Sequence, residues 1–529
     1  MNGRTHAKVA GQGLFRTIRM PQKEPALLLY PLLTGVLTWA CFPKLNQGYL
    51  AWVALAPLIF FLLKTRRIRA AFFAGWLAGT AEFLLLLYWV PPVLSHYGEL
   101  PVPVAWAFLL LIAATLGCFS ATACALTRYG MNRWGDWILS LFPAAWVALE
   151  YARSLFPFAG FPWLLLGYSQ TDVPTLVQTA DLFGVYGVSF LVAWVNTALL
   201  WAWVQRRKGS QVILALSSCA VLLSACAAYG AAALTRWDRV QPQYQAALLQ
   251  QNLSADESDA ALEWKYKEGY VKMAERLGGR PIDLLLLPES PSPLIFQYDK
   301  DYQTCLRQLA RRFPFGIVFN NIRFEEVSGI SAYFNSAFFL DGAGAEVARY
   351  DKIHLVPFGE YIPFKQLFFF TETISKDVGD FMPGKNYVIA PMGSHEVNAL
   401  ICFEAVFGDL SRQFIRRGSQ LIINLTNDGW YGDTSAPYQH LEMARWRAVE
   451  ARRWFLRSAN TGISAIVTPA GRLEASTGLL REAVVTGGFD FLAGETFYVR
   501  HGDDLPIVCA ILWSCILIAG FVMTARGRR

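Results

Sequence analysis

The chain has 529 residues, of which 54% are hydrophobic and 16% are charged. A soluble globular protein has roughly 25% charged residues, so this composition excludes disorder, a collagen-like repeat and a small disulfide scaffold. The apolar residues gather in long runs, which is typical of a membrane protein. The formal net charge is +7, and many basic residues lie in short connections between these runs. That placement indicates charge that sets membrane topology, not nucleic-acid binding.

Eight apolar stretches are long enough to cross a hydrocarbon core of about 30 Å. They lie near 25–42, 48–64, 68–90, 103–127, 137–156, 181–204, 211–234 and 505–524. Lys and Arg are concentrated before the first stretch, in alternate connections and after the last stretch. By the positive-inside rule, both termini are cytoplasmic and the interval between the last two stretches is exported. No small-x-small site closes the first stretch, which predicts a retained anchor and not a cleaved signal peptide.

Three regions follow from this pattern. We expect an N-terminal membrane domain at 1–234 with about seven helices, an exported catalytic domain at 235–504, and a last helix with a cytoplasmic tail at 505–529. Two carboxylates, Glu82 and Glu150, lie inside or at the edge of apolar stretches, where charge is costly. Arg153 offers Glu150 a structural partner at i+3, whereas the role of Glu82 is open.

The exported interval alternates short apolar runs with charged stretches of helical period, which predicts a layered α/β domain. Strands are expected at 244–251, 283–288, 315–320, 334–340, 397–402, 420–425 and 462–468. Helices are expected at 258–277, 301–313, 407–417 and 438–452.

Three polar residues lie where these elements end. Glu289 directly follows the run LLLLP, and Cys402 closes the run VNALIC. Lys352 lies in RYDKIHLVPFGEY, whose aromatic residues and prolines indicate a shaped loop. Catalytic groups of layered α/β domains tend to lie just beyond strand ends, so these three residues are candidates for catalysis.

The cysteines leave three alternatives open. Of the nine cysteines, only Cys305 and Cys402 lie in the exported interval. They can form a disulfide, Cys402 can be an inert buried thiol, or it can be a nucleophile. The third alternative is chemically coherent, because Glu289 can accept the thiol proton while Lys352 stabilises the oxyanion of an acyl intermediate. The backbone N–H of Phe403 is a second candidate donor.

Other chemistries lack their motifs. The sequence has no HExxH, CxxC, GxSxG or phosphate-loop pattern, so we expect neither a metal nor a cofactor. His354 and His440 are interpreted as supporting or packing residues. The run RWRAVEARRWFLR at 445–457 fits an amphipathic helix with a solvated basic face, and contact with lipid headgroups is the alternative.

Glu, Lys and Cys in this order resemble the nitrilase superfamily. The matching motifs are LLLLPES with Glu289, YDKIHLVPFGEY with Lys352, ICFE with Cys402, and NLTNDGWYG at 424–432. Together with eight apolar stretches, GFPWLLLGYSQ at 160–170 and GVYGVSFLVAWVN at 184–196, nearly the whole chain resembles the bacterial apolipoprotein N-acyltransferases.

This resemblance implies an α-β-β-α sandwich in the periplasm, held on the inner membrane by α-helices. It implies transfer of the sn-1 acyl chain of a phospholipid, through a Cys402 thioester, to the α-amine of a diacylglyceryl-cysteine at the N-terminus of an apolipoprotein. Glu289 is then the general base and acid, and Lys352 stabilises the oxyanions. The lipid bilayer is the other partner, and neither nucleic acid nor metal takes part.

The resemblance also assigns supporting residues. Trp264, Asn335, Glu360 and Glu404 correspond to residues that support the site or bind lipid. The family commonly has Tyr after the nucleophile, but this chain has Phe403, so no role of a hydroxyl group carries over. The aromatic residues of 361–382 predict either interior packing or a membrane-facing lid.

Two other functions share parts of this pattern. A membrane-anchored amidohydrolase of the nitrilase type uses the same triad but releases its acyl group to water. A polytopic transporter or sensor with a degenerate site only binds a ligand, and it predicts that Cys402→Ala leaves function intact. Formation of a lysophospholipid and an N-acylated lipoprotein separates the acyltransferase from both.

Overall fold

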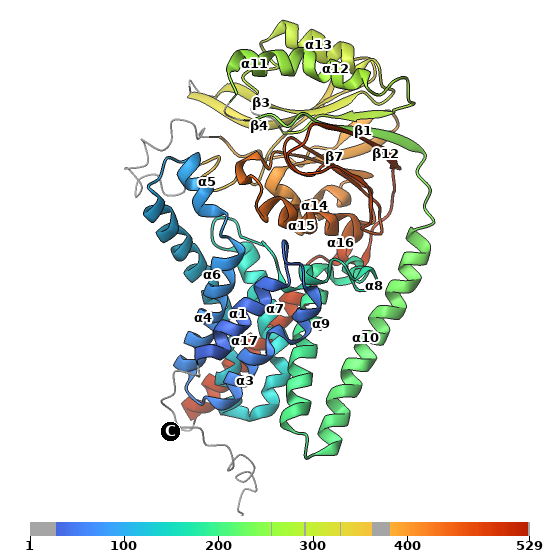
Figure 1. Cartoon of the computed structure of the whole chain (residues 1–529). Coiled ribbons are helices and arrows are strands. Elements are labelled where there is room, and N and C mark those ends of the chain that lie inside the picture. The colour runs from blue at the N-terminus through green and yellow to red at the C-terminus, as the bar shows by residue number, and fades with distance from the viewer. Residues whose placement is uncertain (1–27, 255–256, 290–291, 328–329, 362–380, 527–529) are drawn as a thin grey trace, which may run out of the picture.

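The structure is a computed structural model that describes residues 28–254, 257–289, 292–327, 330–361 and 381–526. A bundle of mostly long helices forms one part of the molecule, and a β-sandwich covered by shorter helices forms the other (Figure 1). The aromatic cluster expected to pack inside or to form a lid falls mostly at 362–380, outside the described residues.

Helices long and apolar enough to cross a membrane make up most of the helical part. Five helices in the described ranges meet both criteria: α4 (Ile68–Leu86), α6 (Val102–Trp134), α9 (Ala180–Val204), α10 (Gly209–Trp237) and α17 (Asp504–Arg526). The remaining predicted stretches form the shorter helices α1 (Leu29–Ala40), α2 (Ala51–Ala54), α3 (Ala56–Lys64) and α7 (Phe142–Leu155). Polytopic membrane architecture is therefore confirmed, whereas eight crossings stay a prediction.

The predicted stretch 68–90 does not form one helix. Helix α4 ends at Leu86, and a separate helix α5 (Val90–His96) follows with proline in its first turn. Pro91 and Pro92 have no backbone N–H to donate, so they are favourable only in the first turn of a new helix. The break places α5 beside the sandwich (Figure 1).

Two sheets form the sandwich. The strands of the first sheet are β1 (Tyr244–Gln250), β2 (Leu284–Leu286), β3 (Ile317–Val327), β4 (Ile330–Leu340), β5 (Glu346–Asp351) and β12 (Ala483–Phe489). The strands of the second sheet are β6 (Ala390–Met392), β7 (His395–Ile401), β8 (Leu421–Thr426), β9 (Phe455–Ala459), β10 (Ala465–Val467) and β11 (Leu473–Ser476). Their orders are β12-β1-β2-β3-β4-β5 and β11-β10-β9-β8-β7-β6.

Helices cover the outer face of each sheet (Figure 1). The first sheet is covered by α11 (Asp259–Trp264), α12 (Tyr270–Glu275) and α13 (Lys300–Ala310). The second sheet is covered by α14 (Gly408–Arg416) and α15 (Ala436–Ala451). The predicted α-β-β-α sandwich is thus confirmed, with the helices of the second sheet lying between the sheets and the membrane helices.

Strand β1 shows why a continuous apolar sequence suits this architecture. Alternate side chains of a strand point to opposite faces. Ala246 and Leu248 pack in the buried cluster shared with the second sheet, while Ala247 and Leu249 pack in the cluster under α12 and α13. Both faces are buried, so the strand reads as an apolar run without alternation.

The interpretation of 445–457 as one helix with a solvated basic face is wrong. Helix α15 ends at Ala451, Arg452 adopts a left-handed conformation (φ 52°), and the chain then enters β9. Arg447, Arg453 and Arg457 are all buried, as is Arg452. These guanidinium groups hold carboxylates and carbonyls inside the protein, a pairing between distant segments that the sequence does not display.

One of these arginines fixes the sandwich on the helical part. Arg452 donates to Asp181 Oδ2 at 2.6 Å and to Gln178 Oε1 at 2.6 Å. Tyr229 of α10 donates its hydroxyl to Asp181 Oδ1 at 2.8 Å. Because a buried ion pair is costly to separate, this contact favours a single orientation of the two parts.

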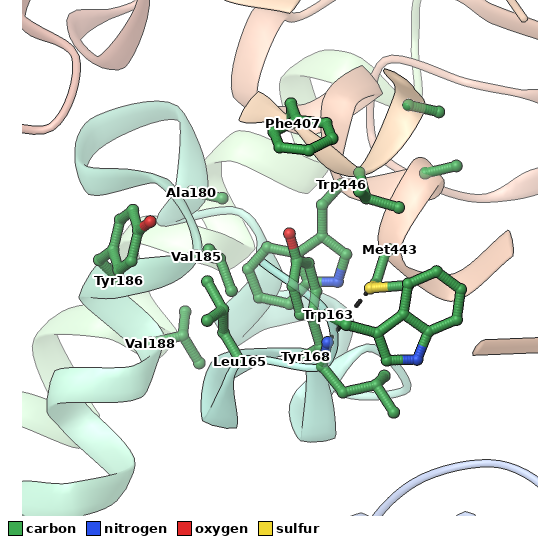
Figure 2. Packing of buried hydrophobic residues seen from close by; sticks show 14 of the residues in the cluster. Trp163, Leu165, Tyr168, Ala180, Val185, Tyr186, Val188, Phe407, Met443 and Trp446 are labelled. Atoms are coloured by element: carbon green, nitrogen blue, oxygen red, sulfur yellow. Dashed lines mark hydrogen bonds between the residues drawn. The ribbon is translucent and has the colours of Figure 1, made fainter. Parts of the chain in front are cut away.

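Helix α15 makes further polar contacts with the helical part. Gln439 Oε1 accepts from the indole N–H groups of Trp89 at 3.2 Å and Trp163 at 2.9 Å. The backbone N–H of Leu164 donates to Met443 Sδ at 3.2 Å, and Figure 2 shows Met443 packed beside Trp163. The membrane part therefore contacts the helix that lies behind the second sheet.

The expected ion pair of Glu150 is not formed. Glu150 Oε1 instead accepts from Trp146 Nε1 at 3.1 Å and from the backbone N–H of Leu166 at 2.7 Å. Arg153 donates to the backbone carbonyl of Trp163 at 2.8 Å. Both side chains therefore bind backbone groups of the connection that follows α7.

Candidate active site

The three sequence-predicted residues converge at one edge of the sandwich. Glu289 follows β2, which runs parallel to β1 and β3, and Cys402 follows β7, which runs parallel to β8. Lys352 directly follows β5. Parallel strands bring their carboxyl ends to a common edge, so residues far apart in the chain become neighbours.

Glu289 lies within reach of both partners. Lys352 Nζ is 3.8 Å from Glu289 Oε1, and the Cys402 thiol lies close enough to the Glu289 carboxylate for each group to influence the pKa of the other. The other carboxylate oxygen of Glu289 accepts from the backbone N–H of Asn427 at 2.9 Å. The carboxylate is therefore held with one oxygen on the protein backbone while it faces the thiol and the ammonium group.

Asn335 and Glu360 complete the surroundings of Lys352. Lys352 Nζ donates to Glu360 at 2.9 Å, and Asn335 Nδ2 donates to both Glu289 Oε1 at 2.8 Å and Glu360 Oε1 at 2.7 Å. The side chain of Lys352 is only 1% exposed. A buried ammonium group between two carboxylates has a fixed position, which suits it to stabilise charge that forms during a reaction.

Glu404 connects the segment of Lys352 with the turn of Cys402. One of its carboxylate oxygens accepts from Tyr350 at 2.7 Å and from the backbone N–H groups of Ile353 and His354 at 2.8 and 3.1 Å. The other oxygen accepts from the backbone N–H of Ile401 at 2.8 Å. Burial raises the pKa of Glu404 to about 7, although these donors lower it. We therefore assign Glu404 to positioning.

Cys402 lies in a strained conformation. Its φ is 51°, a left-handed value that costs a non-glycine residue roughly 1–2 kcal/mol. The residue begins a short 3-10 turn, Cys402–Val406, and is 6% exposed. Strain of this kind is retained when surrounding contacts enforce it, and it is common at reactive residues.

Burial dominates the proton affinities of the site. Desolvation raises the pKa of Glu289 above its usual range; Lys352 opposes that shift and Glu360 adds to it. Desolvation also raises the pKa of the Cys402 thiol, and Glu289 raises it further. Although burial alone lowers the pKa of Lys352, Glu360 and Glu289 raise it above its ordinary value. The resting site therefore has a neutral thiol next to a base and a fixed cation.

Phe403 contacts the helical part of the molecule. Its ring is stacked with those of Phe161 at 6.5 Å and Trp163 at 6.2 Å, measured between ring centroids. It also meets the ring of Phe407 at 5.0 Å. The connection between α7 and α9 thus packs apolar rings on the residue next to Cys402.

Trp264 is not brought to this cluster. It is 44% exposed at the end of α11. Its indole N–H donates to Glu268 at 2.9 Å, and Lys272 Nζ lies 4.6 Å from its ring centroid. These partners belong to the same helical segment, so a role of Trp264 in lipid binding stays a prediction.

Four further polar residues near Cys402 were not identified as a group from the sequence. They are Asn424, Asp428, His440 and Arg457, all buried. Asn424 and Asp428 belong to the quoted NLTNDGWYG motif, and the buried Arg457 lies in the run assigned to a basic helix. The only sequence signal for this group was that Asp428 and Arg457 carry charges next to apolar runs. The disulfide alternative is contradicted, since Cys305 and Cys402 are both free.

The fold defines a nitrilase-like sandwich joined to a domain of long apolar helices. Residues 34–198 match the apolipoprotein N-acyltransferase N-terminal domain family, and residues 245–495 match the carbon-nitrogen hydrolase family. The chain belongs to the apolipoprotein N-acyltransferase family.

The curated relatives extend over nearly the whole chain. The apolipoprotein N-acyltransferase of Geobacter metallireducens is 37% identical, covering 97% of this chain and 98% of that protein. That of Methylococcus capsulatus is 32% identical, covering 95% of this chain and 96% of that protein. Among solved structures, Nit3 of Saccharomyces cerevisiae, a nitrilase superfamily member, is 18% identical with a TM-score of 0.37, covering 47% of this chain and 90% of that one.

Proposed function

We propose that this chain transfers the sn-1 acyl chain of a phospholipid to the α-amine of the diacylglyceryl-cysteine of an apolipoprotein. The observation that carries the proposal is that Glu289 lies beside both Lys352 and Cys402 at the carboxyl ends of the strands. The residue after Cys402, Phe403, packs on Trp163 of the membrane part. An enzyme for free soluble amides does not need that placement. No metal or cofactor enters the mechanism.

In the first half-reaction, Glu289 takes the proton of the Cys402 thiol, and the thiolate attacks the ester carbonyl carbon. Lys352 stabilises the oxyanion, with the backbone N–H of Phe403 as a second donor. When the tetrahedral intermediate collapses, the carbon–oxygen bond breaks and the leaving alkoxide takes the proton from Glu289. The products are a lysophospholipid and a thioester on Cys402.

In the second half-reaction, the lipoprotein amine attacks the thioester carbon, and Glu289 accepts a proton from the attacking nitrogen. Lys352 stabilises the second oxyanion. Collapse breaks the carbon–sulfur bond, an amide forms, and the Cys402 sulfur takes back the proton from Glu289. The enzyme returns to its starting state.

The acceptor distinguishes this function from hydrolysis. The purified protein is given a phospholipid with a labelled sn-1 chain and a synthetic peptide that begins with diacylglyceryl-cysteine. We expect the label in an alkali-stable amide of the peptide, together with an equal amount of unlabelled lysophospholipid. The same peptide with an acetylated α-amine is the control and receives no label. Label released as free fatty acid at an equal rate with either peptide contradicts the proposal.

We further propose that the sandwich faces the periplasm and that both termini are cytoplasmic. The distribution of Lys and Arg between the apolar stretches supports this topology. In intact spheroplasts, an impermeant maleimide is expected to label Asp301→Cys on the sandwich. It is expected to label Lys208→Cys, between α9 and α10, only after permeabilisation, with labelling of the unaltered chain subtracted. The reverse pattern contradicts the topology.

A further inference from the structure

The backbone carbonyl of Cys402 is held by two side chains that the mechanism above does not use. His440 Nε2 lies 3.2 Å from this oxygen, and Asn424 Nδ2 donates to it at 3.4 Å. His440 is on α15 and Asn424 is on β8. Side chains 22 and 38 residues beyond Cys402 therefore meet at the peptide group that follows the strained Cα of the nucleophile.

One guanidinium group orients both donors. Arg457 Nη1 donates to Asn424 Oδ1 at 2.5 Å, and Arg457 Nη2 donates to Asp428 Oδ2 at 2.7 Å. Asp428 Oδ1 and Arg457 Nη2 lie 2.9 and 3.1 Å from His440 Nδ1. The side chains of Asp428 and Arg457 are 0% exposed and that of His440 is 1% exposed, so solvent does not compete for these contacts.

The partners of the imidazole ring determine where its proton lies. A carbonyl oxygen only accepts hydrogen bonds, so the contact with Cys402 requires a proton on His440 Nε2. In the neutral ring, Nδ1 accepts from Arg457; in the protonated ring, Nδ1 donates to Asp428. The hydrogen bond to the Cys402 carbonyl is present in both forms.

His440 does not have the geometry of a catalytic base. Its Nε2 faces the carbonyl of Cys402, whereas the carboxylate that interacts electrostatically with the thiol is that of Glu289. The ring of Trp163, from the membrane part, lies 6.0 Å from the His440 ring between centroids and also stacks on Phe403. The ring of Trp163 thus lies beside the imidazole, which is buried.

We propose that His440 is a positioning residue for the acyl transfer, oriented by Asp428 and Arg457. Its Nε2–H holds the carbonyl of Cys402, keeps this residue in the left-handed conformation (φ 51°), and so directs the sulfur toward Glu289 and Lys352. This inference rests on the proposed thioester chemistry and adds the group that keeps the nucleophile in its reactive geometry.

Two substitutions separate the two ends of the imidazole ring. The amide nitrogen of His440→Gln can occupy the place of Nε2 and donate to the Cys402 carbonyl. The side chain of His440→Asn is shorter, so it reaches only the place of Nδ1 beside Asp428. Thioester formation is measured in single turnovers by intact-protein mass spectrometry over a range of phospholipid concentrations. The mass that the protein gains measures formation of the thioester directly, so transfer to the lipoprotein need not be measured.

We expect His440→Asn to lower the maximal rate of thioester formation by about 100-fold, as for a misplaced reacting group. The phospholipid concentration for half-maximal rate is expected to stay the same, because no substrate contact is lost. His440→Gln is expected to recover most of the rate. The control is His395→Asn at the other end of β7, which removes a partly buried ring stacked on Phe491; it is expected to lower stability but not the maximal rate.

Each other outcome overturns the proposal. Equal rates for the Gln and Asn variants show that the hydrogen bond to the carbonyl does not matter. If the phospholipid concentration for half-maximal rate rises while the maximal rate stays the same, His440 acts in substrate binding. The thermal stability of His440→Asn and His395→Asn is measured in detergent. If both variants lose rate in proportion to their loss of thermal stability, His440 contributes to folding alone. If no variant and no wild-type protein forms a thioester, the proposed function itself fails.

Discussion

Replacing Cys402 with alanine is expected to abolish the acyl-enzyme and to reduce acyl transfer by about 10⁴-fold or more, as for loss of a catalytic nucleophile. Glu289 and Lys352 act on the sulfur and on the oxyanion that the sulfur creates, so neither has a direct route to the ester without the thiol. The loss should appear in the first half-reaction and should not depend on the lipoprotein acceptor.

Mass spectrometry of the intact protein checks this prediction. With phospholipid present and acceptor withheld, the wild type should gain the mass of one fatty acyl group, and hydroxylamine should remove it. Cys305→Ala is the matched control, because Cys305 is the other cysteine of the sandwich and its thiol contacts the backbone carbonyl of Lys267 at 2.8 Å. It should keep the adduct. An adduct that persists in Cys402→Ala, or that disappears in Cys305→Ala, contradicts the assignment.

The sequence was sufficient to predict residues that lie at the ends of apolar strands. Strand β2 and the second half of β7 are buried on both faces, so each reads as a mostly apolar run, and the functional residue that follows the run marks the strand end. Glu289 and Cys402 follow this rule. Lys352 follows β5, which was not predicted, because its sequence EVARYD has no apolar run; the neighbouring prolines and aromatic residues indicated the loop instead.

The buried arginines show where local patterns fail. Arg457 lies in the middle of β9 and is 0% exposed, yet in the sequence it continues a run with helical spacing. Its burial depends on Asp428 and Asn424, which come from a different strand and the loop after it. A charge is stable in the interior only with such partners, and a single sequence does not show which distant residues supply them. The contact between His440 and Cys402 could not be predicted for the same reason, since it also joins residues that are distant in the sequence.

The contact between the sandwich and the membrane part was also beyond the sequence pattern. Trp163 has the residue type that is typical of a membrane interface, but its ring stacks on Phe403 beside the nucleophile, as does the ring of Phe161. Apolar aromatic residues suit both a bilayer surface and a protein interior, so composition does not distinguish these environments. The packing adds a physical reason for the fusion of the two parts, because the connection between α7 and α9 packs on the residue next to Cys402.

Replacing Lys352 with methionine is expected to lower the maximal rate of thioester formation by about 10²–10³-fold, the usual effect of removing one donor to an oxyanion. Methionine keeps much of the apolar length of the side chain, so the cavity created is small. The cation lost is the one that Glu289 and Glu360 share. The substitution therefore leaves two carboxylates joined through Asn335 without a compensating positive charge.

The pH dependence tests the same electrostatics. Glu289 must be ionised to accept the thiol proton, so the rate falls when pH drops through its pKa. Desolvation raises that pKa, Lys352 lowers it and Glu360 raises it. In Lys352→Met the acid limb of the rate profile is expected to move to higher pH, because the ionised carboxylate has lost its cation. In Glu360→Gln a like charge is lost, and the limb is expected to move to lower pH. Thioester formation measured across pH for both variants decides the matter: shifts of the same sign, or none, show that Glu289 is not the titrating base.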